Sequence, residues 1–360
     1  MKAAVLRAVG QPLSIEDVEI DRPHSREVLI RTAAVGVCRS DLHMIEGLAP
    51  TPLPTILGHE SAGVIEEVGS EVRYVKPGDH VITCLSVFCG HCEFCTAGQP
   101  YNCEHPEATR RDGGPSRLSV DGEPIHQFHD LSSFTERMLV HEHAVVKIRD
   151  DMPLDRAALI GCGVITGYGS VVRTAAIERG STVAVIGCGG VGLSAINAAA
   201  MAGAGRIIAV DVHDGKLELA KRFGATDVVD GTTTDAVEVV KDMTSGGVAY
   251  SFEALGRKQT AEQAFRMLRV GGVATIIGML PDGETIEVSA DNLLYDRKLQ
   301  GSTMGSNQFR VDMPRLVDSY LEGKLKLDEL TARRLPLKQI NEAFDGMKSG
   351  EAARSVVVFE

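Results

Sequence analysis

A glycine-rich turn between an apolar strand and a small-residue helix is the feature that most constrains how this chain can fold. The segment "STVAVIGCGGVG" has the spacing G-x-G-x-x-G, with glycines at Gly187, Gly189 and Gly192. The first glycine permits a tight turn, the second lets the backbone approach a pyrophosphate, and the third lets the helix pack closely on the strand. The helix N-terminus then offers N–H groups to the phosphates. The pattern therefore predicts a dinucleotide-binding turn.

Strands and helices alternate around this turn. Apolar runs of strand length ("STVAVIG", "RIIAVD", "VAYSFEALG", "VGGVATIIGML") are separated by helical segments such as "KLELAKRFG" and "RKQTAEQAFRML". Such alternation predicts a parallel sheet with helices on both faces. The second strand ends at Asp211, where an acid binds the adenosine ribose hydroxyls. Because a carboxylate repels a 2′-phosphate and no Arg follows in "DVHDGK", we expect NAD rather than NADP.

The rest of the chain has a different character. The first 150 residues contain short β-type runs broken by Gly and Pro, which predict an irregular β domain. Residues 104–130 are polar and rich in turn residues, so we expect a long surface loop there. Beyond residue 303 the chain is helical and closes on the strand-like "RSVVVF". A length of 360 residues suggests two domains.

Charge and composition exclude several classes of protein. A formal net charge of −12 argues against nucleic acid or an anionic membrane as the main partner, since both require a basic surface. The N-terminus has no apolar stretch of signal-peptide length, and no run approaches the roughly 20 apolar residues of a membrane span. We therefore expect a cytoplasmic protein with reduced thiols.

Four of the eight cysteines crowd into "CGHCEFCTAGQPYNC". Cys89, Cys92, Cys95 and Cys103 follow the spacing C-x2-C-x2-C-x7-C. A reducing compartment disfavours disulfides. An iron–sulfur run would end in C-x3-C-P, whereas here the last gap is seven residues and Glu104 follows. Four thiolates on one structural zinc ion is the favoured interpretation.

The other cysteines are scattered. Cys84 and Cys188 have no evident partner and fit buried thiols. Cys38 lies in "GVCRSDLH", His59 lies in "GHESAG", and Cys162 lies in "LIGCGVITGYG". Two Cys and one His are a known set for catalytic zinc, with the fourth position left for water or substrate. Spacing alone leaves isolated buried residues about equally plausible.

These motifs together resemble the zinc-dependent alcohol dehydrogenases of the medium-chain dehydrogenase/reductase family. The resemblance runs through "GVCRSDLH", "GHESAGVI", the four-cysteine segment, "GCGVITGYGS", "GCGGVG" and "LKQINEAFDGMKSGEAARSVVVF". It implies a Rossmann α/β nucleotide-binding domain at 165–303. It also implies an irregular β-rich, GroES-like catalytic domain at 1–164 and 304–360, with a structural zinc lobe at about 86–105.

The resemblance also implies roles at the metal sites. Cys38, His59 and Cys162 would hold the catalytic zinc, and the four clustered cysteines a structural one. Ser40 and His43 match the family's proton relay. Asp41 would accept the second ring N–H of His59, and Glu60 would approach the metal transiently. Two zinc ions per subunit and NAD are the expected cofactors.

Further residues match cofactor contacts of the family. Arg39 and Arg354 match pyrophosphate contacts, Thr166 and Val191 match residues that press on the nicotinamide, and Lys216 matches one near the adenosine ribose. Together with the three motif glycines and Asp211, they make up the expected cofactor site.

The substrate is less constrained. By the same resemblance Ala49, Leu85 and Phe128 fall near the pocket walls, and Leu85 stands where relatives often carry an aromatic ring. An apolar, open pocket favours medium-chain or aryl primary alcohols and their aldehydes. The alternative is oxidation of formaldehyde–thiol adducts. "GLAPTPLPT" has no charged residue to hold such a thiol, but three loop arginines could: Arg110, Arg111 and Arg117.

Other classes explain less of the sequence. A methyltransferase that uses S-adenosylmethionine would leave both zinc patterns unexplained, and a non-catalytic scaffold would not need all three scattered ligands. Strands near 272–280 and 298–304 match the edge at which the family joins two subunits. Because the long 104–130 segment resembles the dimeric branch, we expect a homodimer.

Overall fold

The computed structural model describes residues 1–105, 116–349 and 354–360. The chain divides into two compact units. Unit 1 comprises Met1–Cys162, Gln308–Gly323 and Thr331–Glu360, and unit 2 comprises Gly163–Asn307 and Lys324–Leu330. From the sequence we expect the divisions after residues 164 and 303, close to the observed ones after 162 and 307. The assignment of catalysis to one part and cofactor binding to the other remains a prediction.

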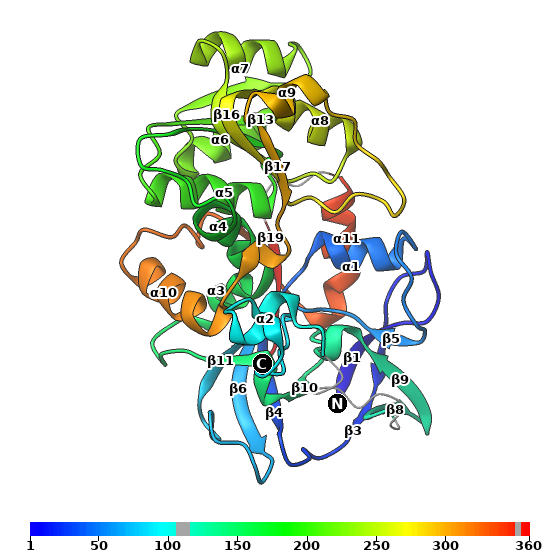
Figure 1. The fold of residues 1–360 in the computed structure, drawn as a ribbon. Helices are drawn as coiled ribbons and strands as arrows, with labels where there is room; N and C mark the ends of the chain where they lie inside the picture. Colours follow the sequence, from blue (N-terminus) through cyan, green and yellow to red (C-terminus); the bar gives the residue numbers. More distant parts are fainter. Residues whose placement is uncertain (106–115, 350–353) are drawn as a thin grey trace. The chain divides into compact units, whose positions relative to one another are not determined.

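Unit 2, whose strands run from green to orange in Figure 1, is built on a parallel sheet of six strands. Their order in the sheet is β14-β13-β12-β15-β16-β17. The strands are β12 (Thr182–Ile186), β13 (Arg206–Asp211), β14 (Asp227–Asp230), β15 (Val248–Glu253), β16 (Leu268–Ile276) and β17 (Lys298–Gly301). Strands β12 and β13 are apolar almost throughout because both of their faces are buried.

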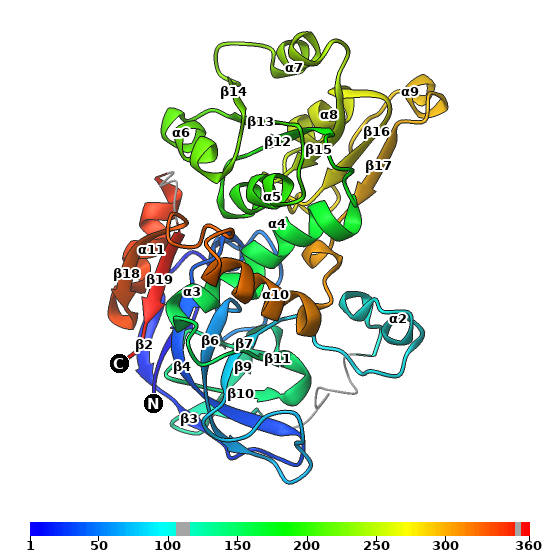
Figure 2. The ribbon, with the colours of Figure 1, turned by 90° about the vertical axis from the view of Figure 1, so that its left-hand side faces the viewer.

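Helices cover both faces of this sheet. On one face lie α4 (Ile165–Gly169), α5 (Gly190–Met201) and α6 (Asp214–Phe223), and on the other lie α7 (Ala236–Thr244) and α8 (Lys258–Arg266) (Figure 2). The short α9 spans Ala290–Leu294. This arrangement confirms the predicted Rossmann-like architecture, with strand order reversing between β12 and β15.

Unit 1 is mainly β. One sheet has the order β2-β1-β5-β9-β8-β3, and the other has the order β11-β7-β6-β4-β19-β18 with β10 also paired to β4. The strands are β1 (Lys2–Leu6), β2 (Ser14–Asp17), β3 (Glu19–Ile20), β4 (Glu27–Gly36), β5 (Thr55–Ile56), β6 (Ser61–Val68), β7 (His80–Thr83), β8 (Leu118–Val120), β9 (Glu123–Gln127), β10 (Arg137–His141), β11 (Val145–Lys147), β18 (Thr331–Pro336) and β19 (Arg354–Val358). The helices are α1 (Arg39–Ile45), α2 (Glu93–Thr96), α3 (Leu154–Leu159), α10 (Phe309–Leu321) and α11 (Ile340–Lys348).

The expectation of a surface loop over 104–130 is wrong for its second half. Residues 118–127 form an antiparallel hairpin of β8 and β9, and β9 also pairs in parallel with β5. Leu118, Ile125 and Phe128 are buried in the core of unit 1. Single apolar residues among polar ones are enough to anchor short strands whose other face is solvated.

A long helix was not foreseen from the sequence. From Leu154 to Thr174 the chain is helical, with π-helical turns at Ile160–Val164 and Ser170–Thr174 between and after α3 and α4. Among the described residues it is the one helix apolar and long enough to cross a membrane, yet 78% of its most apolar window is buried inside the protein. It is therefore a helix of the protein core.

Candidate active site

Three metal donors meet in unit 1 although they are distant in sequence. Cys38 follows β4 and caps α1, His59 lies between β5 and β6, and Cys162 lies in the first π-helical turn. Their donor atoms all lie within 4.8 Å of one another, and all three residues are buried. Zinc–ligand bonds of about 2.0–2.3 Å would place tetrahedral donors roughly 3.5–3.8 Å apart, so this set fits a divalent cation after small adjustments.

Asp41 orients the histidine of this group. Its Oδ1 lies 3.1 Å from His59 Nδ1 and accepts the backbone N–H of Gly58 at 3.0 Å. Its Oδ2 accepts the backbone N–H of Cys38 at 3.3 Å, which closes the first turn of α1. Asp41 is fully buried, and its carboxylate accepts a hydrogen bond from the Nδ1–H group, so Nε2 of His59 remains as the atom that can bind a metal.

The buried thiols share protons in a way that suits cation binding. The S–H of Cys162 donates to Cys38 and so holds the pKa of Cys38 well below its ordinary value. The same contact, together with burial, raises the pKa of Cys162. Burial opposes charge on His59, but the Asp41 carboxylate and Cys38 raise its pKa above the ordinary value. A divalent cation would replace these protons, because metal ligands bind deprotonated.

Glu60 and Arg354 form a buried ion pair beside the thiols. Burial alone would lower the pKa of Arg354, yet Glu60 and the two thiols raise it. The carboxylate of Glu60 packs over Gly36, where a Cβ atom would lie 2.7 Å from Oε2. Nε of Arg354 is buried without a hydrogen-bond partner. Arg39, the other basic residue expected at the pyrophosphate, is exposed.

The two expected relay residues lie on α1. Ser40 Oγ is 3.8 Å from Cys38 Sγ, and His43 is one helical turn further on. Burial, and then the charge of Arg39, lower the pKa of His43. Residues three positions apart share a helix face, so the two side chains project from α1 in the same direction.

The clustered cysteines form a second metal group. Cys89 Sγ lies 3.9 Å from Cys95 Sγ, and Cys92 Sγ lies 3.9 Å from Cys103 Sγ. These spacings match four thiolates on one ion and are far longer than a disulfide bond of about 2.05 Å. The backbone N–H of Cys95 lowers the pKa of Cys92 to about 6. We call residues 86–105, which carry this group, the cysteine lobe.

Cys84 and Cys188 belong to neither metal group of the described residues. All eight cysteines are free. Burial raises the pKa of Cys84 to about 11, which fits an inert core thiol. Cys188 is likewise buried in the glycine turn, where its backbone N–H donates to Asp211.

The glycine turn and Asp211 lie together in unit 2. Asp211 is buried, and its carboxylate accepts the backbone N–H groups of Cys188 at 2.7 Å, Val212 at 2.8 Å and His213 at 3.1 Å. Gly187 has φ 96°, and Gly192 packs so closely on Gly187 that a Cβ atom would lie 1.8 Å from its carbonyl oxygen. Gly189 is the N-cap of α5 and has open space beside it. The turn therefore leaves open space beside its backbone at Gly189, which a side chain there would fill.

The other expected cofactor residues are also in unit 2. Thr166 is buried on α4, and Val191 is half-buried at the start of α5. The two helices touch at Gly167, where a Cβ atom would lie 2.4 Å from the Val191 carbonyl oxygen. Lys216 is half-buried on α6. The structure thus brings Thr166 and Val191 to neighbouring positions.

The expected pocket residues separate into two groups. Phe128 and Ala49 belong to one hydrophobic cluster, whereas Leu85 packs against another. Phe128 lies edge-on to His59, with ring centroids 5.9 Å apart. His129, which the sequence analysis did not consider, is exposed, with its ring 6.0 Å from that of His59. Its φ of 50° is unusual for a non-glycine residue, and no sequence pattern indicated it.

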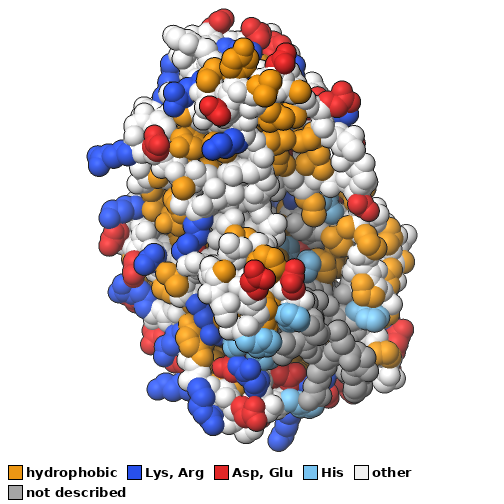
Figure 3. Space-filling model, in the orientation of Figure 1, with side chains coloured by type: hydrophobic (Ala, Val, Ile, Leu, Met, Phe, Trp, Pro, Cys, Tyr) orange, Lys and Arg blue, Asp and Glu red, His pale blue; other side chains and the backbone are white. Residues whose placement is uncertain are grey.

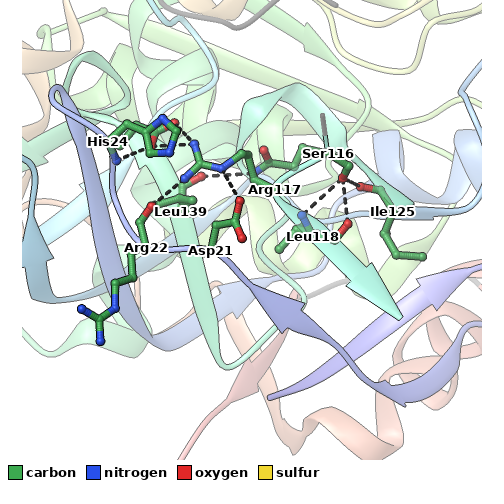
Figure 4. Close-up of polar contacts among 10 residues, drawn as sticks. Asp21, Arg22, His24, Ser116, Arg117, Leu118, Ile125 and Leu139 are labelled. Carbon is green, nitrogen blue, oxygen red and sulfur yellow. Dashed lines mark hydrogen bonds and ion pairs between the residues drawn. The ribbon is translucent and has the colours of Figure 1, made fainter. Parts of the chain in front are cut away.

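Arg117 is not available to hold an anionic substrate. It is buried, and its guanidinium bonds Asp21 and Glu27 at 2.8 Å and the carbonyl oxygen of Arg22 at 2.5 Å (Figure 4). The structure therefore assigns it to tying the β8 strand to the chain before β4. Arg110 and Arg111 lie outside the described residues.

Comparisons with known proteins agree with this geometry. Residues 24–150 match the family model of the alcohol dehydrogenase GroES-like domain, and residues 190–319 match that of zinc-binding dehydrogenase. An alcohol dehydrogenase zinc-binding domain protein from Burkholderia ambifaria is 36% identical, with 100% of this chain and 98% of that chain covered at a TM-score of 0.95.

Two further solved structures resemble the chain over its length. Benzyl alcohol dehydrogenase from Acinetobacter calcoaceticus is 32% identical, covering 100% of this chain and 99% of that chain at a TM-score of 0.95. A zinc-binding dehydrogenase from Sinorhizobium meliloti 1021, solved with NADP, is 28% identical, covering 99% of each chain at a TM-score of 0.81. The predicted pairing of a GroES-like with a Rossmann-like part is confirmed.

Proposed function

Since the chain belongs to the zinc-dependent alcohol dehydrogenases of the medium-chain dehydrogenase/reductase family, we propose that it interconverts apolar primary alcohols, aryl alcohols above all, and their aldehydes with NAD. The observation that carries this proposal is a contrast within the part of the chain that the structure describes: one group has four thiolates, and the other, fully buried, has three donors. Three protein ligands leave one position for a substrate oxygen.

Each residue near the three donors then has a defined task. Cys38, His59 and Cys162 would hold zinc, which would supply a Lewis acid that eases deprotonation of a hydroxyl group, and nicotinamide would supply a hydride acceptor. Asp41 fixes the His59 tautomer. Ser40 takes the substrate proton, and His43 passes it outward. Because burial lowers the pKa of His43, its imidazole is neutral near pH 7 and can accept that proton.

Two observations support an aryl substrate. The aromatic ring of Phe128 and the imidazole of His129 both lie beside the metal ligand His59. Flat rings of this kind pack well on an aryl group. One relative, 32% identical, is a benzyl alcohol dehydrogenase. The thiol-adduct alternative needs a cation to hold the thiol's carboxylates, and Arg117 does not serve because it is engaged in ion pairs with Asp21 and Glu27.

NAD is the proposed cofactor because of Asp211. Its carboxylate is fixed by three backbone N–H groups at the end of β13, where it would accept the 2′-hydroxyl and repel a 2′-phosphate. Asp211→Asn keeps the shape and removes the charge, so we expect the preference for NAD over NADP to shrink. The nearby Asp214→Asn on α6 serves as the control and should leave that preference unchanged.

We propose a homodimer that works in the cytoplasm. Strand β17 pairs only with β16 in the described sheet, which leaves one edge for a second copy. Apolar side chains gather over α9 and β17 (Figure 3), with Leu294 80% and Tyr295 62% exposed. A tetramer or monomer in light scattering would contradict the dimer. Eight reduced cysteines suit the cytoplasm.

The deciding test is the initial rate of NADH formation with benzyl alcohol, hexanol and ethanol, and with a formaldehyde–thiol mixture. We expect the highest kcat/KM for benzyl alcohol and the lowest for ethanol. A response to the formaldehyde–thiol mixture alone would move the protein to the thiol-adduct branch. Repeating the series with NADP tests the cofactor.

A further inference from the structure

A strained turn lies against the helix that carries Thr166. Met304, Gly305 and Ser306 follow one another with φ values of 47°, 69° and 48°. Non-glycine residues rarely adopt such values, because their Cβ atoms then clash with the backbone, and they keep them only where the surroundings hold the chain. Two of them in a run of three show that this turn is held in place, and strain of this kind concentrates at functional sites.

Close packing is one reason why the 304–306 turn keeps this backbone conformation. A Cβ atom on Gly305 would lie 2.5 Å from the Ile165 carbonyl oxygen and 2.7 Å from that of Thr166. The turn therefore presses directly on the backbone of α4. Thr166 Oγ1 is 3.6 Å from Met304 Sδ, so the turn also touches the side chain expected at the nicotinamide.

A chain of four hydrogen-bonded hydroxyl groups also holds the turn against the helix. Ser170 Oγ is 2.8 Å from Ser302 Oγ, which is 2.8 Å from Thr174 Oγ1, which in turn is 2.7 Å from Ser306 Oγ. At its inner end Ser170 donates to the Thr166 carbonyl oxygen at 2.7 Å. Ser170 is fully buried, and Ser302 is nearly so.

These hydroxyls connect both sides of the expected nicotinamide contact. Ser170 and Thr174 belong to the helix after Thr166, whereas Ser302 and Ser306 flank Met304. In a buried site a hydroxyl chain holds its members more firmly than isolated bonds would, because hydrogen bonds in series reinforce one another. Gln300 adds a bond from β17 to the Thr174 carbonyl oxygen at 3.2 Å.

We infer that Ser170, Ser302, Thr174 and Ser306 are positioning residues that hold the strained 304–306 turn and Thr166 in the geometry that binds the nicotinamide end of the cofactor. This inference rests on the proposed function. Without the hydroxyl chain the turn relaxes, and cofactor binding must impose the strain again. The adenosine end, held by the glycine turn and Asp211, is unaffected.

The test compares Thr174→Val, which removes the hydroxyl and keeps the shape, with Thr174→Ser, which restores it. We expect Thr174→Val to raise the dissociation constant of NADH about tenfold and to leave that of ADP-ribose, which lacks nicotinamide, unchanged. Thr174→Ser should bind NADH as the parent protein does. Nucleotide fluorescence and calorimetry measure these constants on the intact protein.

Two results would overturn the inference: unchanged NADH binding in Thr174→Val, or equal loss of NADH and ADP-ribose. If Thr174→Val does not fold, Ser170→Ala interrupts the same chain at its inner end and must show the same selective loss. Failure of the parent protein to bind NADH would instead contradict the proposed function.

Discussion

The cysteine lobe and the three-donor site differ in how the chain brings their metal ligands together. The lobe takes four ligands from residues 89–103, and backbone N–H groups of the same segment bond their sulfurs. The three-donor site takes Cys38, His59 and Cys162 from segments that only the folded β-rich unit brings together. One site is local, and the other depends on the fold.

The two sites also differ in how deeply their ligands are buried and in which groups orient those ligands. Cys95 and Cys103 of the lobe are half-exposed, whereas every donor of the other site is buried. In the lobe, backbone amides orient the sulfurs. In the three-donor site, one side chain, Asp41, orients the histidine and also caps α1. A local segment with few apolar contacts needs its ion to hold its shape, whereas a buried site retains its shape without one.

The largest expected effect follows from removing one ligand of the lobe. Cys103→Ser leaves three thiolates and loses the ion, and structural zinc contributes about 10–16 kcal/mol to the folding of small domains. We expect little or no soluble protein. A soluble Cys103→Ser variant with two zinc ions and an unchanged melting temperature would contradict the structural role of the lobe.

The matching change in the three-donor site should act on activity instead. Cys162→Ser should stay folded, lose one of two zinc ions, and lose kcat/KM by more than about 100-fold, the upper range for residues that only orient a ligand. Elemental analysis, melting and initial rates measure the three effects. Cys84→Ser changes a buried thiol that belongs to no metal group and is the control. If Cys84→Ser lost zinc and activity as much as Cys162→Ser does, Cys162 could not be assigned as a metal ligand.

This difference also explains what the sequence could predict. The glycine turn, Asp211 and the four clustered cysteines are each a short pattern whose physical reason is local, so they could be assigned from their residues. Cys162 stands 103 positions after His59. No local rule joins residues so far apart, and only the resemblance to a family assigned them to one site.

The features that sequence analysis missed are tertiary. Arg117 looked like a solvated loop cation, but the β8–β9 hairpin carries it to Asp21 and Glu27. His129 reaches His59 through a left-handed backbone that no composition signals. The helix over 154–174 was missed because its glycines suggest turns, whereas in the structure they allow close packing against neighbouring segments.

An intermediate effect is expected at Asp41. Asp41→Asn removes the charge that raises the pKa of His59 and can present an N–H group where a carboxylate oxygen accepted one. Metal affinity at the three-donor site should fall by about 10–100-fold. Competition with a chelator, followed by zinc release over time, should show faster loss of one ion only. Release of both ions at parent rates would show that Asp41 does not orient the ligand.

The smallest expected effect concerns acid stability next to the lobe. Burial, and then the charge of His143, lower the pKa of His141 to about 4, and its Nδ1 accepts the backbone N–H of His143 at 3.0 Å. The His143 ring stacks on Phe88, the residue before the first lobe cysteine, with centroids 4.5 Å apart. Protonation of His141 would therefore weaken a contact that supports the lobe from outside.

The sign of the pH effect follows from the direction of that shift. An unfolded histidine binds its proton near pH 6.5, whereas His141 in the folded chain resists protonation down to about pH 4. Stability is therefore lost as the pH falls through this window. His141→Gln cannot titrate, so its melting temperature should fall by about 1–3 °C less than that of the parent between pH 7 and pH 5. His126→Gln changes an exposed histidine and is the control. If the melting temperature fell equally in the parent and in His141→Gln, the contact from His141 on β10 would not stabilise the lobe.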